Sequence, residues 1–109
     1  DSKTIVAGIL LNRLKSNMPL QTDAVFTYIL DKTSDELTMH YLEMDSPYNT
    51  YTHKGLPPTP IANPGMESIL AVLEPTESKY MYYLTDSDGI FHYAKTFEEH
   101  KQNKIRYLR

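Results

Sequence analysis

Apolar residues recur at helical spacing near the start of the chain. Over residues 4–16 they form one stripe with a second row beside it: Val6, Leu10 and Leu14, then Ile5, Ile9 and Leu11. This period predicts an amphipathic helix. Asp1 or Ser2 is suited to its N-cap, and Pro19 lies just beyond its end.

Three shorter segments also have patterns that predict helical structure. The apolar run 24–30 follows Thr22 and Asp23, either of which suits the N-cap. Residues 33–42 begin with a capping-box pattern, Thr33 to Glu36, and predict a short helical turn. Residues 65–73 predict a third helix, which Pro75 limits.

The last third of the chain predicts a hairpin. Residues 79–85 and 90–95 are rich in aromatic side chains, and Asp88-Gly89 between them is a turn signal. A helical turn over 97–104 follows. We therefore expect one small α+β domain of several short helices, a long proline-rich loop and a C-terminal β-hairpin.

Residues 46–65, SPYNTYTHKGLPPTPIANPG, interrupt this pattern. They hold five of the seven prolines, which excludes a regular helix or a central strand. They are also too rich in aromatic and aliphatic residues for a solvated linker. We expect a stiff loop that presents side chains in fixed directions at little entropic cost.

Composition narrows the chemistry mainly by exclusion. The net charge of −3 without a basic block argues against a nucleic-acid partner. No cysteine is present, the four histidines lack metal-ligand spacing, and no phosphate-binding glycine loop occurs, so we expect no metal and no cofactor. No apolar run approaches the length of a membrane span.

Two polar clusters are the candidate binding residues. Gln21-Thr22-Asp23 follows a Pro-Leu turn, and Tyr48-Asn49-Thr50-Tyr51 opens the proline-rich loop. Helix capping and turn formation would explain several of them. Amides, hydroxyls and tyrosine faces also suit an uncharged, polyhydroxylated ligand such as a glycan. From the residues alone, a sugar-binding groove is one interpretation beside plain structural roles.

Several segments, in order, resemble the YceG-like (MltG-type) endolytic murein transglycosylases. They are LLNRL (10–14), LQTD (20–23), SPYNTY (46–51), GLPP-x-PI (55–61), NPG (63–65) and the hairpin that ends in Glu98-Glu99-His100. Thr59 stands where that family usually has glycine. The similarity runs over nearly the whole chain, which it identifies as part of such a catalytic domain (residues 1–109).

The resemblance implies cleavage within peptidoglycan strands, between N-acetylmuramic acid and N-acetylglucosamine, without water. One glutamic acid protonates the glycosidic oxygen and then deprotonates the muramyl 6-hydroxyl, which closes a 1,6-anhydro ring. Ordinary glycosidases need two carboxylates for their two roles. Burial against apolar walls would raise the pKa of the single acid, as its task requires.

The resemblance places that glutamic acid upstream of Asp1, so we expect no catalytic residue in this chain and no cleavage by it alone. It implies a cleft with these substrate-binding residues: Gln21, Thr22, Asp23, Tyr48, Asn49, Thr50 and Tyr51, with Pro57, Pro58, Pro60 and Ile61 as its stiff wall. It also implies a site of action at the extracytoplasmic face of the bacterial cytoplasmic membrane, with an anchor outside this chain.

Two alternatives stay open at this point. The domain could bind glycan without cleaving it, or the proline-rich loop could dock cell-wall synthesis proteins. We also expect the face of helix 4–16 that carries Ile5, Ile9 and Leu11 to be exposed, or covered by a second copy of the chain.

Overall fold

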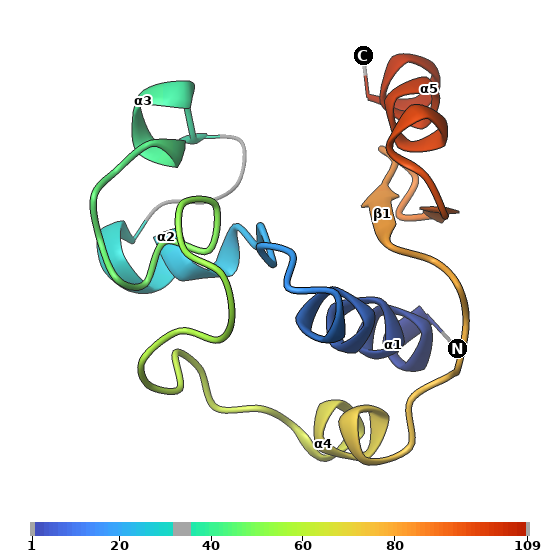
Figure 1. Ribbon diagram of the computed structural model, residues 1–109, viewed down its shortest axis with the longest axis horizontal. Coiled ribbons are helices and arrows are strands. Elements are labelled where there is room, and N and C mark those ends of the chain that lie inside the picture. The colour runs from blue at the N-terminus through green and yellow to red at the C-terminus, as the bar shows by residue number, and fades with distance from the viewer. Residues whose placement is uncertain (1, 32–35, 109) are drawn as a thin grey trace. The chain divides into compact units, whose positions relative to one another are not determined.

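The structure is a computed structural model that describes residues 2–31 and 36–108. The elements are, in order, α1 (Ser2–Lys15), α2 (Ala24–Leu30), α3 (Met39–Leu42), α4 (Met66–Leu73), β1 (Tyr82–Thr85), β2 (Phe91–Ala94) and α5 (Phe97–Tyr107) (Figure 1). These helices and the two-stranded antiparallel sheet confirm the predicted α+β class.

The chain divides into two compact units. One unit consists of Asp1–Asn12 and Gly65–Arg109, and the other of Arg13–Pro64. Helix α1 runs from the first unit into the second. The units are described separately below.

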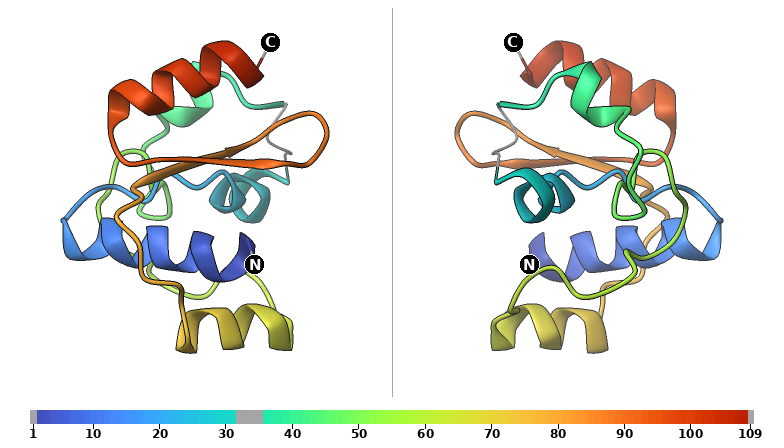
Figure 2. Two further views of the ribbon diagram at one scale, coloured as in Figure 1. Left: turned by 90° about the vertical axis from the view of Figure 1, so that its right-hand side faces the viewer. Right: turned by 90° about the vertical axis from the view of Figure 1, so that its left-hand side faces the viewer.

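The β-hairpin and α5 form the centre of the first unit. Strands β1 and β2 pair Tyr82 with Ala94 and Thr85 with Phe91, and Gly89 takes φ +80° in the turn between them. Both strands contact α5, and the Tyr82 ring stacks on His100 at 4.9 Å between ring centroids. Figure 2 shows the hairpin between α5 and residues 2–12 of α1, with α4 on the other side of α1.

Helix α5 begins with a side-chain N-cap, Thr96, that the sequence pattern did not predict. Thr96 Oγ1 accepts a hydrogen bond from the Glu99 backbone N–H at 3.2 Å, and its hydroxyl also contacts Glu99 Oε1 at 3.1 Å. Such a cap supports the first turn of a helix. The helical turn predicted over 97–104 starts where expected but extends to Tyr107, so α5 is longer than predicted.

The segment that leads into the hairpin follows α1 closely. The Thr76 backbone N–H donates to the Thr4 carbonyl oxygen at 3.1 Å, and Asn12 Nδ2 donates to the carbonyl oxygens of Ser78 and Tyr80, each at 3.0 Å. The approach is closest at Gly8, where a Cβ atom would collide with the Thr76 carbonyl oxygen. Glycine is therefore required there by space.

We expected the face of α1 that carries Ile5, Ile9 and Leu11 to be exposed or covered by a second copy, and this expectation is wrong for Ile9. Ile9 is fully buried, while Ile5 and Leu11 are half-buried. Helix α4 instead carries five exposed apolar side chains: Met66, Ile69, Leu70, Val72 and Leu73. Only Ala71 of this helix is buried, because one face of so short a helix contacts few neighbours.

The second unit starts with the end of α1. Asn17 has φ +57°, and the Met18 backbone N–H donates to the Arg13 carbonyl oxygen at 2.9 Å, which closes the helix. The buried guanidinium of Arg13 donates to the Pro19 carbonyl oxygen at 2.8 Å. Val25 and Phe26 of α2 are fully buried and supply the apolar core of this unit.

Two predictions about helix starts need correction. Asp23 occupies the N-cap position of α2, but neither it nor Thr22 caps the helix with its side chain. Of the segment predicted over 33–42, residues 33–35 lie outside the described residues, and the α-helix that the structure describes is Met39–Leu42; Thr38 at its N-cap makes no side-chain cap bond. Asp1 and Thr33 of the two other proposed caps lie outside the described residues. Within the described ranges, no helix has the length and apolarity to cross a bilayer.

We predict that Gly8→Ala destabilises the protein. Helix propensity alone favours alanine by about 1 kcal/mol, but overpacking against a backbone carbonyl costs about 1–3 kcal/mol, so the free energy of unfolding should fall. Chemical denaturation measures it. Gly65→Ala is the control for space alone, because no atom beyond its chain neighbours lies within 4 Å of its Cβ position. Since Gly65 is the N-cap of α4, where alanine is disfavoured, this substitution should cost only about 0.5 kcal/mol. A stabilised Gly8→Ala variant would refute the close contact.

Candidate functional site

The turn over residues 46–53 is organised around the side chain of Asn49, which is 0% exposed. Its Nδ2 donates to the carbonyl oxygens of Leu42 at 3.1 Å and Met44 at 2.7 Å. Its Oδ1 accepts from the Tyr51 backbone N–H at 2.9 Å. Both amide hydrogens and the amide oxygen are therefore used inside the unit, so Asn49 positions the turn.

Thr50 joins this turn to the segment that carries the other predicted polar cluster. Its carbonyl oxygen accepts from the Gln21 backbone N–H at 3.2 Å, and its Oγ1 accepts from the Thr22 backbone N–H at 3.0 Å. The Thr50 hydroxyl also lies 3.2 Å from the Thr22 carbonyl oxygen. Thr50 is 2% exposed, so these bonds are shielded from water.

The same turn also positions the side chain of Asp23, through Tyr51. The Tyr51 hydroxyl donates to Asp23 Oδ1 at 2.5 Å, and both side chains are half-buried. The Tyr51 ring lies 6.0 Å from the Phe26 ring, so the hydroxyl end is directed by packing of the ring. Asp23 thus has a bonding partner other than the helix end that the sequence suggested.

A hydroxyl pair connects the turn at the start of the proline-rich loop to the later, proline-dense part of the same loop. The hydroxyls of Tyr48 and Thr59 lie 2.8 Å apart, and the Tyr48 ring packs on Tyr28 with ring centroids 5.2 Å apart. Sequence reasoning missed Tyr28 and treated Thr59 only as a departure from the family pattern. Residues in the predicted wall differ in exposure: Pro58 and Pro60 are exposed, while Pro57 and Ile61 are half-buried.

The structure thus brings most of the predicted site residues together by hydrogen bonds, in two roles. Asn49 and Thr50 are buried and hold backbone, while Thr22, Asp23, Tyr48 and Tyr51 are half-buried and Gln21 is exposed. The resulting surface offers an amide, hydroxyls and one carboxylate. Within the described residues, no group of three or more metal-ligand side chains occurs.

The first unit contains a separate pocket of about 390 Å³. Apolar and aromatic side chains of α1, α4 and the hairpin line most of it, among them Val6, Leu10, Val72, Tyr83 and Phe91. None of the sequence-predicted site residues is among those that line it. The polar cluster and the pocket are therefore distinct features.

Glutamate is the residue type that the proposed resemblance requires as a general acid, so the surroundings of the described glutamates matter. All of them are exposed: Glu36, Glu43, Glu67, Glu74, Glu77, Glu98 and Glu99. A hydrogen bond from Lys3, at 2.6 Å, lowers the pKa of Glu67, and its charge acts in the same direction. A general acid needs the opposite shift, so the environment of Glu67 does not suit that role.

The comparisons with known proteins agree with the resemblance seen in the sequence. The model of the YceG-like family matches residues 1–106. The chain belongs to the YceG-like family. An endolytic murein transglycosylase of Bacillus subtilis (strain 168) is 46% identical over 103 residues, which cover 94% of this chain and 29% of that protein.

Two further relatives extend the comparison. An endolytic murein transglycosylase of Streptococcus pneumoniae is 30% identical over 114 aligned positions, covering 99% of this chain and 21% of the relative. The crystal structure of a YceG-like protein from Listeria monocytogenes has a TM-score of 0.85 at 43% identity, covering 91% of this chain and 33% of the other. This YceG-like chain therefore spans about a third or less of these relatives.

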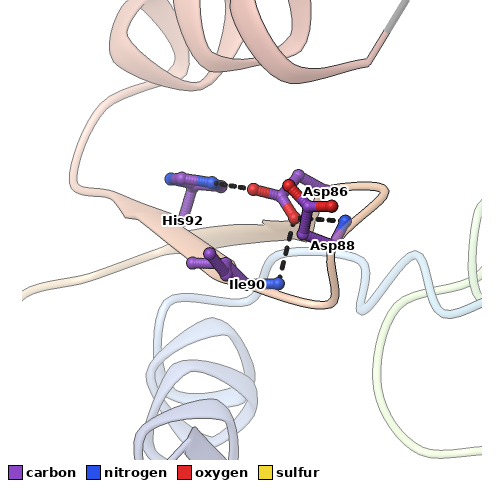
Figure 3. A network of polar contacts seen from close by, with 4 residues as sticks. All are labelled: Asp86, Asp88, Ile90 and His92. Carbon is purple, nitrogen blue, oxygen red and sulfur yellow. Dashed lines mark hydrogen bonds and ion pairs between the residues drawn. The ribbon is translucent and has the colours of Figure 1, made fainter.

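A second polar network stabilises the hairpin turn of the first unit (Figure 3). Asp86 Oδ1 accepts from the backbone N–H groups of Asp88 at 2.8 Å and Ile90 at 3.0 Å, and Oδ2 lies 2.8 Å from His92 Nε2. The His92 ring stacks on Tyr107 of α5 at 3.5 Å between centroids. The hydrogen bond to His92, followed by that from Ile90, lowers the pKa of Asp86.

We predict that this network weakens in acid. Because the folded state lowers the pKa of Asp86, its carboxylate stabilises the fold above the unfolded pKa of about 3.9, and this contribution disappears as the pH falls through the folded pKa. The difference in melting temperature between the wild type and Asp86→Asn should therefore shrink below about pH 4. Asp88→Asn, at an exposed side chain, is the control. A difference that is constant from pH 6 to pH 2 would contradict the role of Asp86.

Proposed function

We propose that this YceG-like chain is part of a peptidoglycan lytic transglycosylase that acts within glycan strands. The observation that carries the proposal is 46% identity over 94% of the chain to a protein named endolytic murein transglycosylase. The chain would belong to the catalytic domain of such an enzyme. Its site of action would be the extracytoplasmic face of the bacterial cytoplasmic membrane, where peptidoglycan lies.

The chemistry of the polar cluster supports a glycan as the ligand. Sugar rings offer hydroxyl groups and apolar ring faces, and the segments 20–23 and 48–51 offer an amide, hydroxyls and tyrosine rings. The neutral groups bind an uncharged polyol without the desolvation cost of an unpaired ion, and the Asp23 carboxylate accepts a hydrogen bond from the Tyr51 hydroxyl. Thr22, Asp23, Tyr48 and Tyr51 would contact the strand, with Asn49 and Thr50 as positioning residues.

The proposed reaction breaks the bond between N-acetylmuramic acid and N-acetylglucosamine. The glycosidic oxygen leaves with the proton that a carboxylic acid provides. The resulting carboxylate takes the proton of the muramyl 6-hydroxyl, whose oxygen bonds to its own anomeric carbon, so the acid is restored. One carboxyl group suffices because the nucleophile is part of the substrate. In this scheme the cluster binds and orients the strand, and the proline-rich residues 57–61 stiffen one side of the cleft.

The proposal predicts 1,6-anhydro products from the protein expressed from its complete gene. Purified sacculi should release glycan fragments with anhydromuramic ends and no free reducing ends, as mass spectrometry would show. Thr22→Val removes a hydroxyl at nearly constant volume and should reduce the rate, because that hydroxyl would contact the strand.

Thr38→Val is the matched control for the same loss of a hydroxyl, because the Thr38 side chain is exposed and makes no cap bond to α3. Release of ordinary reducing ends would refute the reaction type. Glycan binding without any product would instead support a binding module.

A further inference from the structure

Three non-glycine residues among those described have positive φ: Asn17 at +57°, Gln21 at +52° and Asp31 at +55°. Asn and Asp tolerate this left-handed conformation better than other side chains. Asn17 and Asp31 also have a local reason for it, because each follows the end of a helix, where a left-handed residue closes the last turn.

Gln21 has neither the residue type nor the position after a helix end that would explain a positive φ. Its side chain is long, and it follows the Pro19-Leu20 segment, not a helix end. Its backbone is fixed from outside, because its N–H donates to the Thr50 carbonyl oxygen at 3.2 Å and the next residue bonds to Thr50 through both its N–H and its carbonyl oxygen. The surrounding structure thus imposes a conformation that glutamine disfavours.

The side chain of Gln21 does not compensate for this strain within the fold. It is exposed, and it makes no hydrogen bond to the other described residues. Glycine at this position would satisfy the same backbone without strain. Strained backbone that the rest of the structure holds in place is characteristic of functional sites, because it fixes the direction of a side chain before the ligand arrives.

We propose that Gln21 is a specificity-determining residue that binds a secondary amide of the ligand. This inference rests on the proposed function, in which the ligand is a peptidoglycan strand. A carboxamide has one acceptor oxygen and two donor hydrogens, which complement the N–H and C=O of another amide. Peptidoglycan offers this group in two places, the acetamido group of its sugars and its stem peptides. The neighbouring Thr22 and Tyr51 groups would bind hydroxyls and so favour the sugar.

The test compares two neutral, peptide-free probes that differ in this group. Hexamers of β-1,4-linked N-acetylglucosamine and of β-1,4-linked glucose are titrated into the protein expressed from its complete gene, and a stem peptide without sugar is the third probe. Gln21→Gly removes the amide and the strain, and Gln21→Glu keeps the shape but replaces the N–H donor. Asn17→Gly, at the same φ but outside the polar cluster, is the matched control.

We expect the wild type to prefer the N-acetylated hexamer, and both Gln21 variants to reduce that preference about three- to tenfold, the value of one hydrogen bond. The melting temperature of Gln21→Gly should stay equal or rise, because strain is relieved. Asn17→Gly should leave the preference unchanged. Binding of the stem peptide that depends on Gln21, without a preference between the hexamers, would also support amide recognition and assign it to the peptide.

Two results would overturn the inference: a preference that survives Gln21→Gly, or a melting temperature that falls by several degrees in that variant. A wild type that shows neither the preference nor peptide binding would overturn it as well. The proposed function fails separately, through the absence of anhydro products. If the protein shows a preference that depends on Gln21 but yields no anhydro products, the proposed reaction is wrong while the inference about amide recognition by Gln21 still holds.

Discussion

The buried carboxamide of Asn49 is the interaction on which the candidate site depends. It replaces three hydrogen bonds that regular secondary structure would otherwise provide, because it bonds to two carbonyl oxygens and one N–H of an irregular turn. A buried backbone polar group without a partner costs free energy comparable to a lost hydrogen bond. The turn can therefore pack beside the apolar core of Val25 and Phe26 only while Asn49 satisfies these groups.

Thr50 transfers that rigidity to a distant part of the sequence. Because Asn49 fixes the turn, the carbonyl oxygen and hydroxyl of Thr50 have defined directions, and they bond to residues 21 and 22. The positive φ of Gln21 is a consequence of these bonds. Buried residues thus do the positioning, and exposed or half-buried neighbours supply the groups that a ligand would meet. The proline-rich loop adds stiffness, with Tyr48 and Thr59 as its described link.

Periodicity and turn chemistry predicted the elements of the fold well. The stripe of α1, the Asp88-Gly89 turn and the aromatic strands are local signals, and each appears at nearly its predicted position. The length of α5 was missed because its residues are mostly polar, so packing of Tyr107 and His100 on the hairpin, not apolar periodicity, extends it. The division of the chain into two units has no local signal at all.

The sequence pointed to polar residues that the structure brings together, but it did not reveal their structural roles. Asn49 and Asn63 look alike in the sequence, yet only the tertiary structure distinguishes an amide with three bonds from an exposed one. Asp23 has the residue type and place of a helix cap, and its bond to Tyr51, 28 positions away, overrides that tendency. The left-handed backbone of Gln21 could not be foreseen, because glutamine rarely adopts it.

Hydrogen exchange in Asn49→Asp would test the coupling of the two segments most directly. Aspartate keeps the shape but directs an oxygen, in place of two N–H donors, at the carbonyl oxygens of Leu42 and Met44. We predict that the amides of Tyr51, Gln21 and Thr22 lose protection together, while the exposed control Asn63→Asp leaves them unchanged. Loss at Tyr51 with full protection at Gln21 and Thr22 would contradict the account.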